Sequence, residues 1–162
     1  MRAPTITHLQ WHMILFLDFD GVLHPEPCHN EVQLFSCLPR LEAILRDYPA
    51  VQIVISSTWR EGRSISEIRS YFSDDISARI IGVTPAWNDI PDITEVIGYK
   101  RHAEIEGWLR YSGEPWQDWV AIDDKAYLFK PFLQNLVKTN PAKGLDECAE
   151  LDLRLRFEKA RS

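Results

Sequence analysis

The stretch Met13-Ile-Leu-Phe-Leu-Asp18-Phe-Asp20-Gly21 places two carboxylates directly after a run of apolar residues. Continuous apolar runs of this length are typical of strands that are buried on both faces of a parallel sheet. In extended backbone Asp18 and Asp20 project to the same side, whereas Phe19 points into the packing. Gly21 then allows the chain to turn sharply away. The sequence therefore predicts a buried strand over residues 13–17 that ends in a pair of acidic side chains.

Apolar runs and helical repeats alternate along the rest of the chain. The predicted strands cover residues 13–17, 51–55, 79–83, 119–122 and 136–139. The predicted helices cover residues 39–48, 64–72, 100–111 and 145 onward, the last with Cys148, Leu151 and Leu155 on one face. Residues 84–98 contain two prolines and are expected to form a loop. Strands that alternate with helices indicate an α/β domain with a mainly parallel sheet.

Length and composition indicate one soluble domain. A chain of 162 residues can bury its apolar surface in one core, and we expect a flanking arm over residues 1–12 followed by the domain over residues 13–162. Cys28, Cys37 and Cys148 are odd in number and widely spaced, which favours a reducing compartment over a disulfide framework. The run over 13–17 is too short to span a membrane. We therefore expect a cytoplasmic protein with no membrane contact and no obligate protein partner.

Polar clusters follow three of the predicted strands. They are Asp18-Phe-Asp20, Ser56-Ser57-Thr58 and Asp123-Asp124. In parallel α/β sheets ligands bind beyond the carboxyl ends of the strands, so neighbouring strands would bring these clusters to one edge. Carboxylates at one edge repel one another unless a cation intervenes, and an all-oxygen set favours Mg²⁺ over zinc. We therefore expect a magnesium site formed by Asp18, Asp20, Asp123 and Asp124.

A magnesium site of this kind suits phosphoryl transfer. Mg²⁺ retains several waters and shares its coordination shell with substrate phosphates. Phosphoryl transfer in turn requires positioning and neutralisation of the phosphate oxygens, and a carboxylate can act as the covalent nucleophile. The formal net charge of −6 argues against a protein that binds along nucleic acid over a broad surface, because such a protein needs a basic face. It is compatible with a local basic pocket.

The residues Asp18-Phe-Asp20-Gly21-Val22-Leu23 resemble motif I of the haloacid dehalogenase (HAD) superfamily. A hydrophobic strand that ends at Ser56, a later lysine or arginine, and a strand that ends in Ile122-Asp123-Asp124 resemble motifs II, III and IV in the same order. The resemblance implies a HAD-like Rossmannoid three-layer sandwich with a parallel five-stranded sheet in the order 3-2-1-4-5. Both inserts after the first two motifs are too short for a full cap domain, so we expect a capless fold or a minimal cap.

The resemblance also implies a two-step phosphatase reaction through an aspartyl-phosphate. Asp18 would be the nucleophile, and Asp20 would protonate the leaving oxygen and then deprotonate the attacking water. Mg²⁺ would be held by Asp123, together with Asp124, Asp18 and the backbone carbonyl of Asp20. Hydroxyl and cationic side chains would bind the phosphoryl group and the substrate. These are Ser56 with Ser57 as its rival, and Arg101 or Lys100 as the motif III cation. From their positions, His24 and Arg60 are further candidate substrate contacts, with a plain loop histidine and a solvated or structural arginine as the alternatives.

A narrower resemblance concerns the substrate. Ile55-Ser-Ser-Thr-Trp-Arg60, Ile81-Gly-Val-Thr-Pro85, Arg101 with Glu104, and residues 120–124 are similar to the small HAD domains associated with bacterial RNA-repair proteins. This similarity implies removal of phosphates from nucleic-acid ends or from nucleotides. Two alternatives stay open, namely a phosphotransferase with the same chemistry and a non-catalytic binding or regulatory module with the same fold.

Overall fold

Five parallel strands form one sheet in the computed structural model, which describes residues 11–91 and 98–162. The strands are β1 (Met13–Leu17), β2 (Val51–Ile55), β3 (Ile80–Val83), β4 (Trp119–Asp123) and β5 (Leu136–Lys138). Their spatial order is β3-β2-β1-β4-β5, which confirms the expected order. β1 lies between β2 and β4, and all of its side chains are buried. Burial on both faces explains why its sequence is apolar without interruption.

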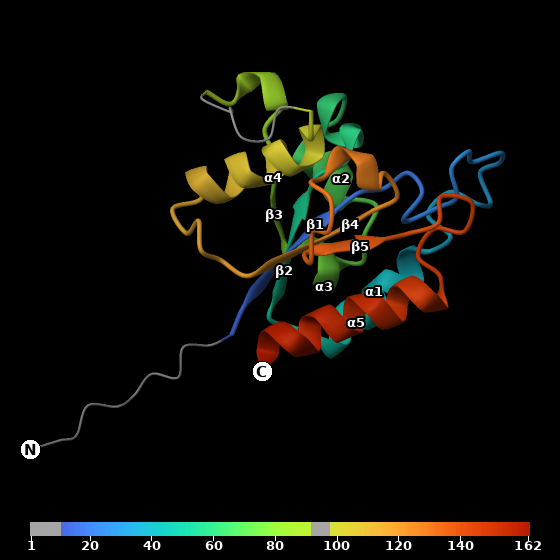
Figure 1. Ribbon diagram of the computed structural model, residues 1–162. Coiled ribbons are helices and arrows are strands. Elements are labelled where there is room, and N and C mark those ends of the chain that lie inside the picture. Colours follow the sequence, from blue (N-terminus) through green and yellow to red (C-terminus); the bar gives the residue numbers. More distant parts are fainter. Residues whose placement is uncertain (1–10, 92–97) are drawn as a thin grey trace, which may run out of the picture.

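Helices cover both faces of this sheet (Figure 1). They are α1 (Leu38–Asp47), α2 (Ile65–Arg69), α3 (Asp74–Ser77), α4 (Lys100–Tyr111) and α5 (Glu147–Arg161). On one face, Leu15 of β1 belongs to the same buried cluster as Leu41 of α1 and Leu153 of α5. On the other face, Phe16 clusters with Ile105 of α4. The two apolar layers make the domain the three-layer α/β sandwich that was expected.

Local sequence signals explain where the helices begin. Pro39 lies in the first turn of α1, where a missing backbone N–H removes no helical hydrogen bond. The Oγ of Ser64 accepts a hydrogen bond from the N–H of Glu67 at 3.1 Å and so caps α2. The bounds of β1, β2 and α4 match the prediction, and those of the other strands differ from it by one residue.

Two features between β2 and β3 differ from the prediction. α2 ends at Arg69 and not near residue 72, and the hydroxyl of Ser70 donates to the carbonyl of Glu67 where the helix stops. The short helix α3 was not predicted at all. Its first turn follows Ser73, whose N–H and Oγ donate to the carboxylate of Glu42 on α1 at 2.7 and 2.6 Å. This tertiary contact has no local signal in the sequence.

The stripe expected on α5 lies on the exposed face of that helix. Its members are Cys148, Leu151 (61% exposed) and Leu155 (59% exposed). The buried residues of α5 are Ala149, Leu153 and Phe157. Both sets recur at helical spacing, so the pattern alone does not select one of them. The packing selects the set with Phe157, whose ring centroid lies 5.0 Å from that of Tyr48.

Two expected segments fall partly outside the described residues. Residues 1–10 of the expected arm lie outside, whereas Trp11 packs against the core. Residues 92–97 of the expected loop also lie outside, and its described part contains the 3₁₀ turn η2 (Trp87–Asp89). Between β1 and α1, residues 18–37 form turns without a helix or strand, so no cap domain is inserted there. No helix in the described ranges is both long and apolar enough to cross a membrane.

Candidate active site

The register of the sheet brings the expected polar residues to one edge. Leu17 pairs with the last residue of β2 and with Ile122 of β4. Asp18, Ser56 and Asp123 therefore follow at the same level on three adjacent strands. The N–H of Asp18 donates to the carbonyl of Ile122 at 3.2 Å, and the N–H of Ser56 donates to the carbonyl of Leu17 at 3.0 Å. The backbone ladder thus continues to the first residues beyond the strands and holds them in place.

Asp18, Asp123 and Asp124 form a buried acidic cluster. One carboxylate oxygen of each residue lies within 4.8 Å of the others. Burial is the main cause that raises the pKa of Asp123 above its ordinary range, and the negative charge of Asp18 adds to it. Burial also raises the pKa of Asp124. Burial and mutual repulsion thus make the negative charge of the cluster costly, and a bound divalent cation would reduce that cost. Three carboxylate oxygens at this separation fit Mg²⁺, which takes oxygen ligands and keeps several waters.

Arg101 supplies positive charge to this cluster. Its Nη1 lies 3.2 Å from Oδ1 of Asp18 and 2.7 Å from Oδ2 of Asp123, and its Nε lies 3.7 Å from Glu104. Burial disfavours the charged guanidinium, but the charges of Asp123 and Asp18 raise the pKa of Arg101. Lys100, the other candidate cation, is exposed and lines the wall of a pocket. Of the two, Arg101 is the side chain in direct contact with the acidic cluster.

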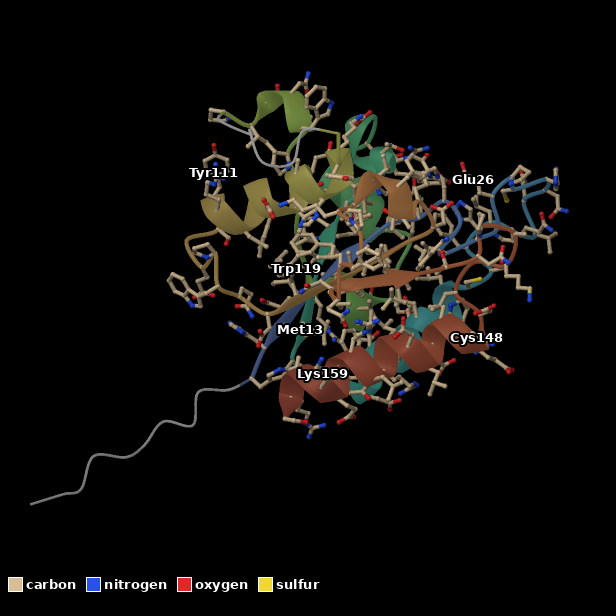
Figure 2. All side chains as sticks on the ribbon, viewed as in Figure 1. Met13, Glu26, Tyr111, Trp119, Cys148 and Lys159 are labelled. Carbon is tan, nitrogen blue, oxygen red and sulfur yellow. The ribbon has the colours of Figure 1, made fainter. Side chains whose placement is uncertain are left out.

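A pocket of about 260 Å³ opens beside the cluster. Charged residues of both signs line it, among them Asp18, Asp20, Glu26, Lys100, Arg101 and Lys125. A larger hollow of about 450 Å³ lies at the amino ends of β1 and β4, where Met13, Trp119 and Lys159 line it. Figure 2 shows Met13 and Lys159 in the lower part of the view, away from Glu26 at the upper right. The candidate site is the smaller pocket, because Asp18 of the acidic cluster and its partner Arg101 both line it.

Ser57 and Arg60, two expected substrate contacts, bind neighbouring parts of the protein. The Oγ of Ser57 accepts a hydrogen bond from the backbone N–H two residues on and caps the 3₁₀ turn η1 (Thr58–Glu61). The Arg60 guanidinium donates to the carbonyls of Ser57 and Thr84, each at 2.9 Å, and pairs with Glu104 at 3.0 Å. The side chains of Arg60 and Glu104 are almost fully buried. Arg60 therefore ties the ends of β2 and β3 to α4.

Two pocket-lining residues, Thr58 and Lys125, were missed from the sequence. Thr58 belongs to the same polar cluster as Ser56, whose own side chain is buried. Lys125 follows directly after Asp124, and its Nζ lies 2.7 Å from Glu26 and 3.4 Å from Asp124. Burial works against its charge, but the hydrogen bond to Glu26 raises the pKa of Lys125. Its place next to the acidic pair in the sequence was the signal that could have identified it.

His24, another expected substrate contact, is buried, with 1% of its surface exposed. Its Nε2 lies 2.9 Å from Oδ1 of Asp20. The indole N–H of Trp59 also donates to Asp20 and lies 3.1 Å from each carboxylate oxygen. The hydrogen bond from His24 lowers the pKa of Asp20, and the hydrogen bond from Trp59 lowers it further, although burial acts in the opposite direction. The Asp20 side chain thus stands apart from the acidic cluster, with partners of its own, and is not one of the clustered side-chain ligands.

The strand order and the acidic residues that follow β1 and β4 define a HAD-like α/β domain. The chain belongs to the family described as the HAD domain in Swiss Army Knife RNA repair proteins, whose family model matches residues 14–149. The match covers all five strands and the start of α5. Comparison with curated proteins and with solved structures gave no match.

Proposed function

We propose that this domain is a Mg²⁺-dependent phosphohydrolase that cleaves phosphate monoesters through an aspartyl-phosphate on Asp18. The proposal rests on the buried cluster of Asp18, Asp123 and Asp124 within 4.8 Å, with Arg101 in contact with two of the three carboxylates. These carboxylates would hold Mg²⁺, which when bound neutralises negative charge on the phosphoryl oxygens. Asp18 also lines the pocket, which leaves its carboxylate accessible to a substrate.

In the first step, an oxygen of the Asp18 carboxylate forms a bond to phosphorus. The bond between phosphorus and the leaving oxygen breaks, and its electron pair goes to that oxygen. The leaving oxygen takes a proton from the carboxyl of Asp20, whose pKa the negative charge of the bound phosphoryl group would raise against the lowering effect of His24 and Trp59. The guanidinium of Arg101 is placed beside Asp18, where it can bind a phosphoryl oxygen as charge develops. Ser56, level with Asp18, is the proposed hydroxyl partner of the same group.

In the second step, the Asp20 carboxylate takes a proton from a water molecule. The water oxygen bonds to phosphorus, and the bond between phosphorus and Asp18 breaks. Its electron pair restores the Asp18 carboxylate, and inorganic phosphate leaves. Asp18 and Asp20 both line the pocket, which is the arrangement that this division of roles requires. A phosphotransferase would replace the water with an acceptor hydroxyl in this step.

Hydrolysis of an aryl phosphate should depend on Mg²⁺. We expect activity that is lost in excess EDTA and restored by added Mg²⁺. Mg²⁺ alone should raise the melting temperature because it neutralises buried carboxylates, with about 2.7 kcal/mol of stabilisation at 100 times the Kd. Equal hydrolysis with and without EDTA would contradict the proposal. A protein that binds Mg²⁺ but cleaves no phosphate ester would instead support the alternative of a binding module.

The absence of a side chain at Gly21 should be needed for tight Mg²⁺ binding. Its φ is +73°, and a Cβ at this position would lie 2.5 Å from Oδ2 of Asp124. Gly21→Ala should displace that carboxylate and weaken Mg²⁺ binding about 10- to 100-fold, as measured by calorimetric titration. Gly113→Ala is the matched control, because Gly113 has φ +83° but open space around it. If both variants bind Mg²⁺ like the wild type, Asp124 is not a ligand.

The substrate that we infer is a phosphate at a nucleic-acid end. The matched family takes its description from RNA repair proteins. Tyr127, in the 3₁₀ turn η3 (Ala126–Leu128), is 71% exposed, and its neighbours Lys125 and Leu128 both line the pocket. An exposed aromatic ring next in sequence to pocket-lining residues is suited to stack a terminal base. A local contact of this kind is compatible with a net charge of −6.

Phosphorylated oligonucleotides should be better substrates than small phosphate esters. We expect kcat/KM for a 3′- or 5′-phosphorylated oligonucleotide to exceed that for mononucleotides and sugar phosphates. Tyr127→Ala should raise KM for the oligonucleotide about 5- to 100-fold more than KM for an aryl phosphate, because stacking contributes about 1–3 kcal/mol per base. Tyr111→Ala is the control, since Tyr111 is 60% exposed at the far end of α4 (Figure 2). A preference for sugar phosphates would reject this substrate class.

A further inference from the structure

Both ring nitrogens of the buried His24 have partners. The backbone N–H of Phe35 donates to its Nδ1 at 3.4 Å, so Nδ1 carries a lone pair and no proton. The proton of the neutral imidazole is then on Nε2, which lies 2.9 Å from Oδ1 of Asp20. Nε2 is therefore the donor and the Asp20 carboxylate the acceptor. The backbone of Phe35 selects the tautomer that His24 presents to Asp20.

The donors around Asp20 distinguish its two oxygens. Oδ1 accepts hydrogen bonds from Nε2 of His24 at 2.9 Å and from Nε1 of Trp59 at 3.1 Å. Oδ2 accepts a hydrogen bond from Trp59 but not from His24. The Asp20 side chain lines the pocket and is 34% exposed. Oδ1 is thus anchored by two N–H groups, and Oδ2, which accepts from one of them, keeps more capacity to carry a proton.

An aromatic cluster holds His24 in this position. The ring centroid of His24 lies 5.4 Å from that of Phe35, in an edge-to-face arrangement, and 5.7 Å from that of Trp59. Phe35 also stacks on Tyr71 at 4.9 Å. Phe35 has φ 57°, a left-handed conformation that a residue with a bulky side chain adopts only when its surroundings enforce it. That conformation accompanies the hydrogen bond from its N–H to His24.

We propose that His24 is a positioning residue for the acid–base step, which anchors Oδ1 of Asp20 so that Oδ2 exchanges the proton with the substrate. This inference rests on the proposed function and extends it to a residue outside the pocket. In the first step, Oδ2 of Asp20 gives its proton to the leaving oxygen as the bond between that oxygen and phosphorus breaks. In the second step, Oδ2 takes a proton from the attacking water.

The need for a proton from Asp20 depends on the leaving group. An alkyl phosphate releases an alkoxide unless its oxygen is protonated, whereas p-nitrophenyl phosphate releases a stable phenolate that needs no proton. A misplaced Asp20 should therefore impair formation of the aspartyl-phosphate from an alkyl ester more than from an aryl ester. Because kcat/KM reports that first step, the ratio of kcat/KM for the two substrates separates a positioning role from a purely structural one.

The experiment compares His24→Phe, which keeps an aromatic ring but lacks a donor, with His24→Gln, whose amide N–H can replace Nε2–H. We expect His24→Phe to lose about 10²-fold in kcat/KM for an alkyl phosphate, and much less for p-nitrophenyl phosphate. His24→Gln should recover part of the loss. Tyr48→Phe is the control, because it removes a partly buried hydrogen bond to Glu158 (2.7 Å) that is remote from the pocket. This control should leave the ratio unchanged.

A second measurement does not depend on activity. ¹⁵N–¹H spectra of the wild-type imidazole should show a proton on Nε2 of His24 and none on Nδ1. Equal losses for the two substrates, or a proton on Nδ1, would overturn the positioning role. A wild-type protein that hydrolyses neither substrate would overturn the proposed function and the positioning role with it, whereas equal losses in an active enzyme overturn the positioning role alone.

Discussion

Asp18→Asn should abolish hydrolysis of phosphate esters, with kcat lowered at least about 10³-fold. The amide of asparagine has nearly the shape of the carboxylate but lacks the charge and nucleophilicity needed to attack phosphorus. It should also weaken Mg²⁺ binding, because Asp18 contributes one of the three oxygens that lie within 4.8 Å of one another. Steady-state kinetics on an aryl phosphate and calorimetric titration with Mg²⁺ measure the two effects.

The matched control for Asp18→Asn is Asp118→Asn. Asp118 is exposed and directly precedes β4, whereas Asp123 ends the same strand at the candidate site. The control makes the same chemical change at the opposite edge of the sheet, so it should keep wild-type kinetics. Thermal unfolding of both variants establishes that they are folded. Wild-type hydrolysis by a folded Asp18→Asn protein would show that Asp18 is not the nucleophile.

The elements that were predicted correctly are those whose own sequence determines their burial. β1 is apolar throughout because it lies in the middle of the sheet, and its run of apolar residues marks both of its ends. α5 shows the opposite case, because Leu151 and Phe157 lie on different faces at equally good helical spacing. Only contact with α1 and β5 decides which face is buried. The short helix α3 likewise depends on a contact with Glu42, a residue far away in the sequence.

The same distinction applies to the candidate site. Asp18 and Asp123 were brought together by a general property of parallel sheets, since residues that follow adjacent strands meet at one edge. The substrate-binding roles expected of Arg60 and His24 stay predictions, and the structure shows that both side chains are almost fully buried, which polarity in the sequence does not reveal. Arg60 binds backbone carbonyls, and His24 binds Asp20, a neighbour four residues away. The contact of Arg60 with Thr84 arises only when two separate loops pack together, whereas the contact of His24 with Asp20 forms within one loop.

Arg101→Met should both destabilise the metal-free protein and reduce activity. Without the guanidinium, the carboxylates of Asp18 and Asp123 lose a contact at 3.2 Å and one at 2.7 Å while remaining buried. Removing one partner of a buried ion pair typically lowers the free energy of unfolding by about 3–5 kcal/mol. Loss of a cation that binds the phosphoryl group should lower kcat about 10²- to 10³-fold. Urea unfolding and steady-state kinetics measure these changes.

Lys100→Met distinguishes the two candidate cations. Lys100 is exposed, so its loss should change the free energy of unfolding by less than about 1 kcal/mol. A larger loss of kcat in Lys100→Met than in Arg101→Met would transfer the motif III role to Lys100. Mg²⁺ supplies a further test, because it should stabilise Arg101→Met more than the wild type. In the variant, the metal replaces positive charge that Arg101 otherwise provides to Asp18 and Asp123. If Mg²⁺ raises the free energy of unfolding less in the variant than in the wild type, the guanidinium and the metal do not share these carboxylates.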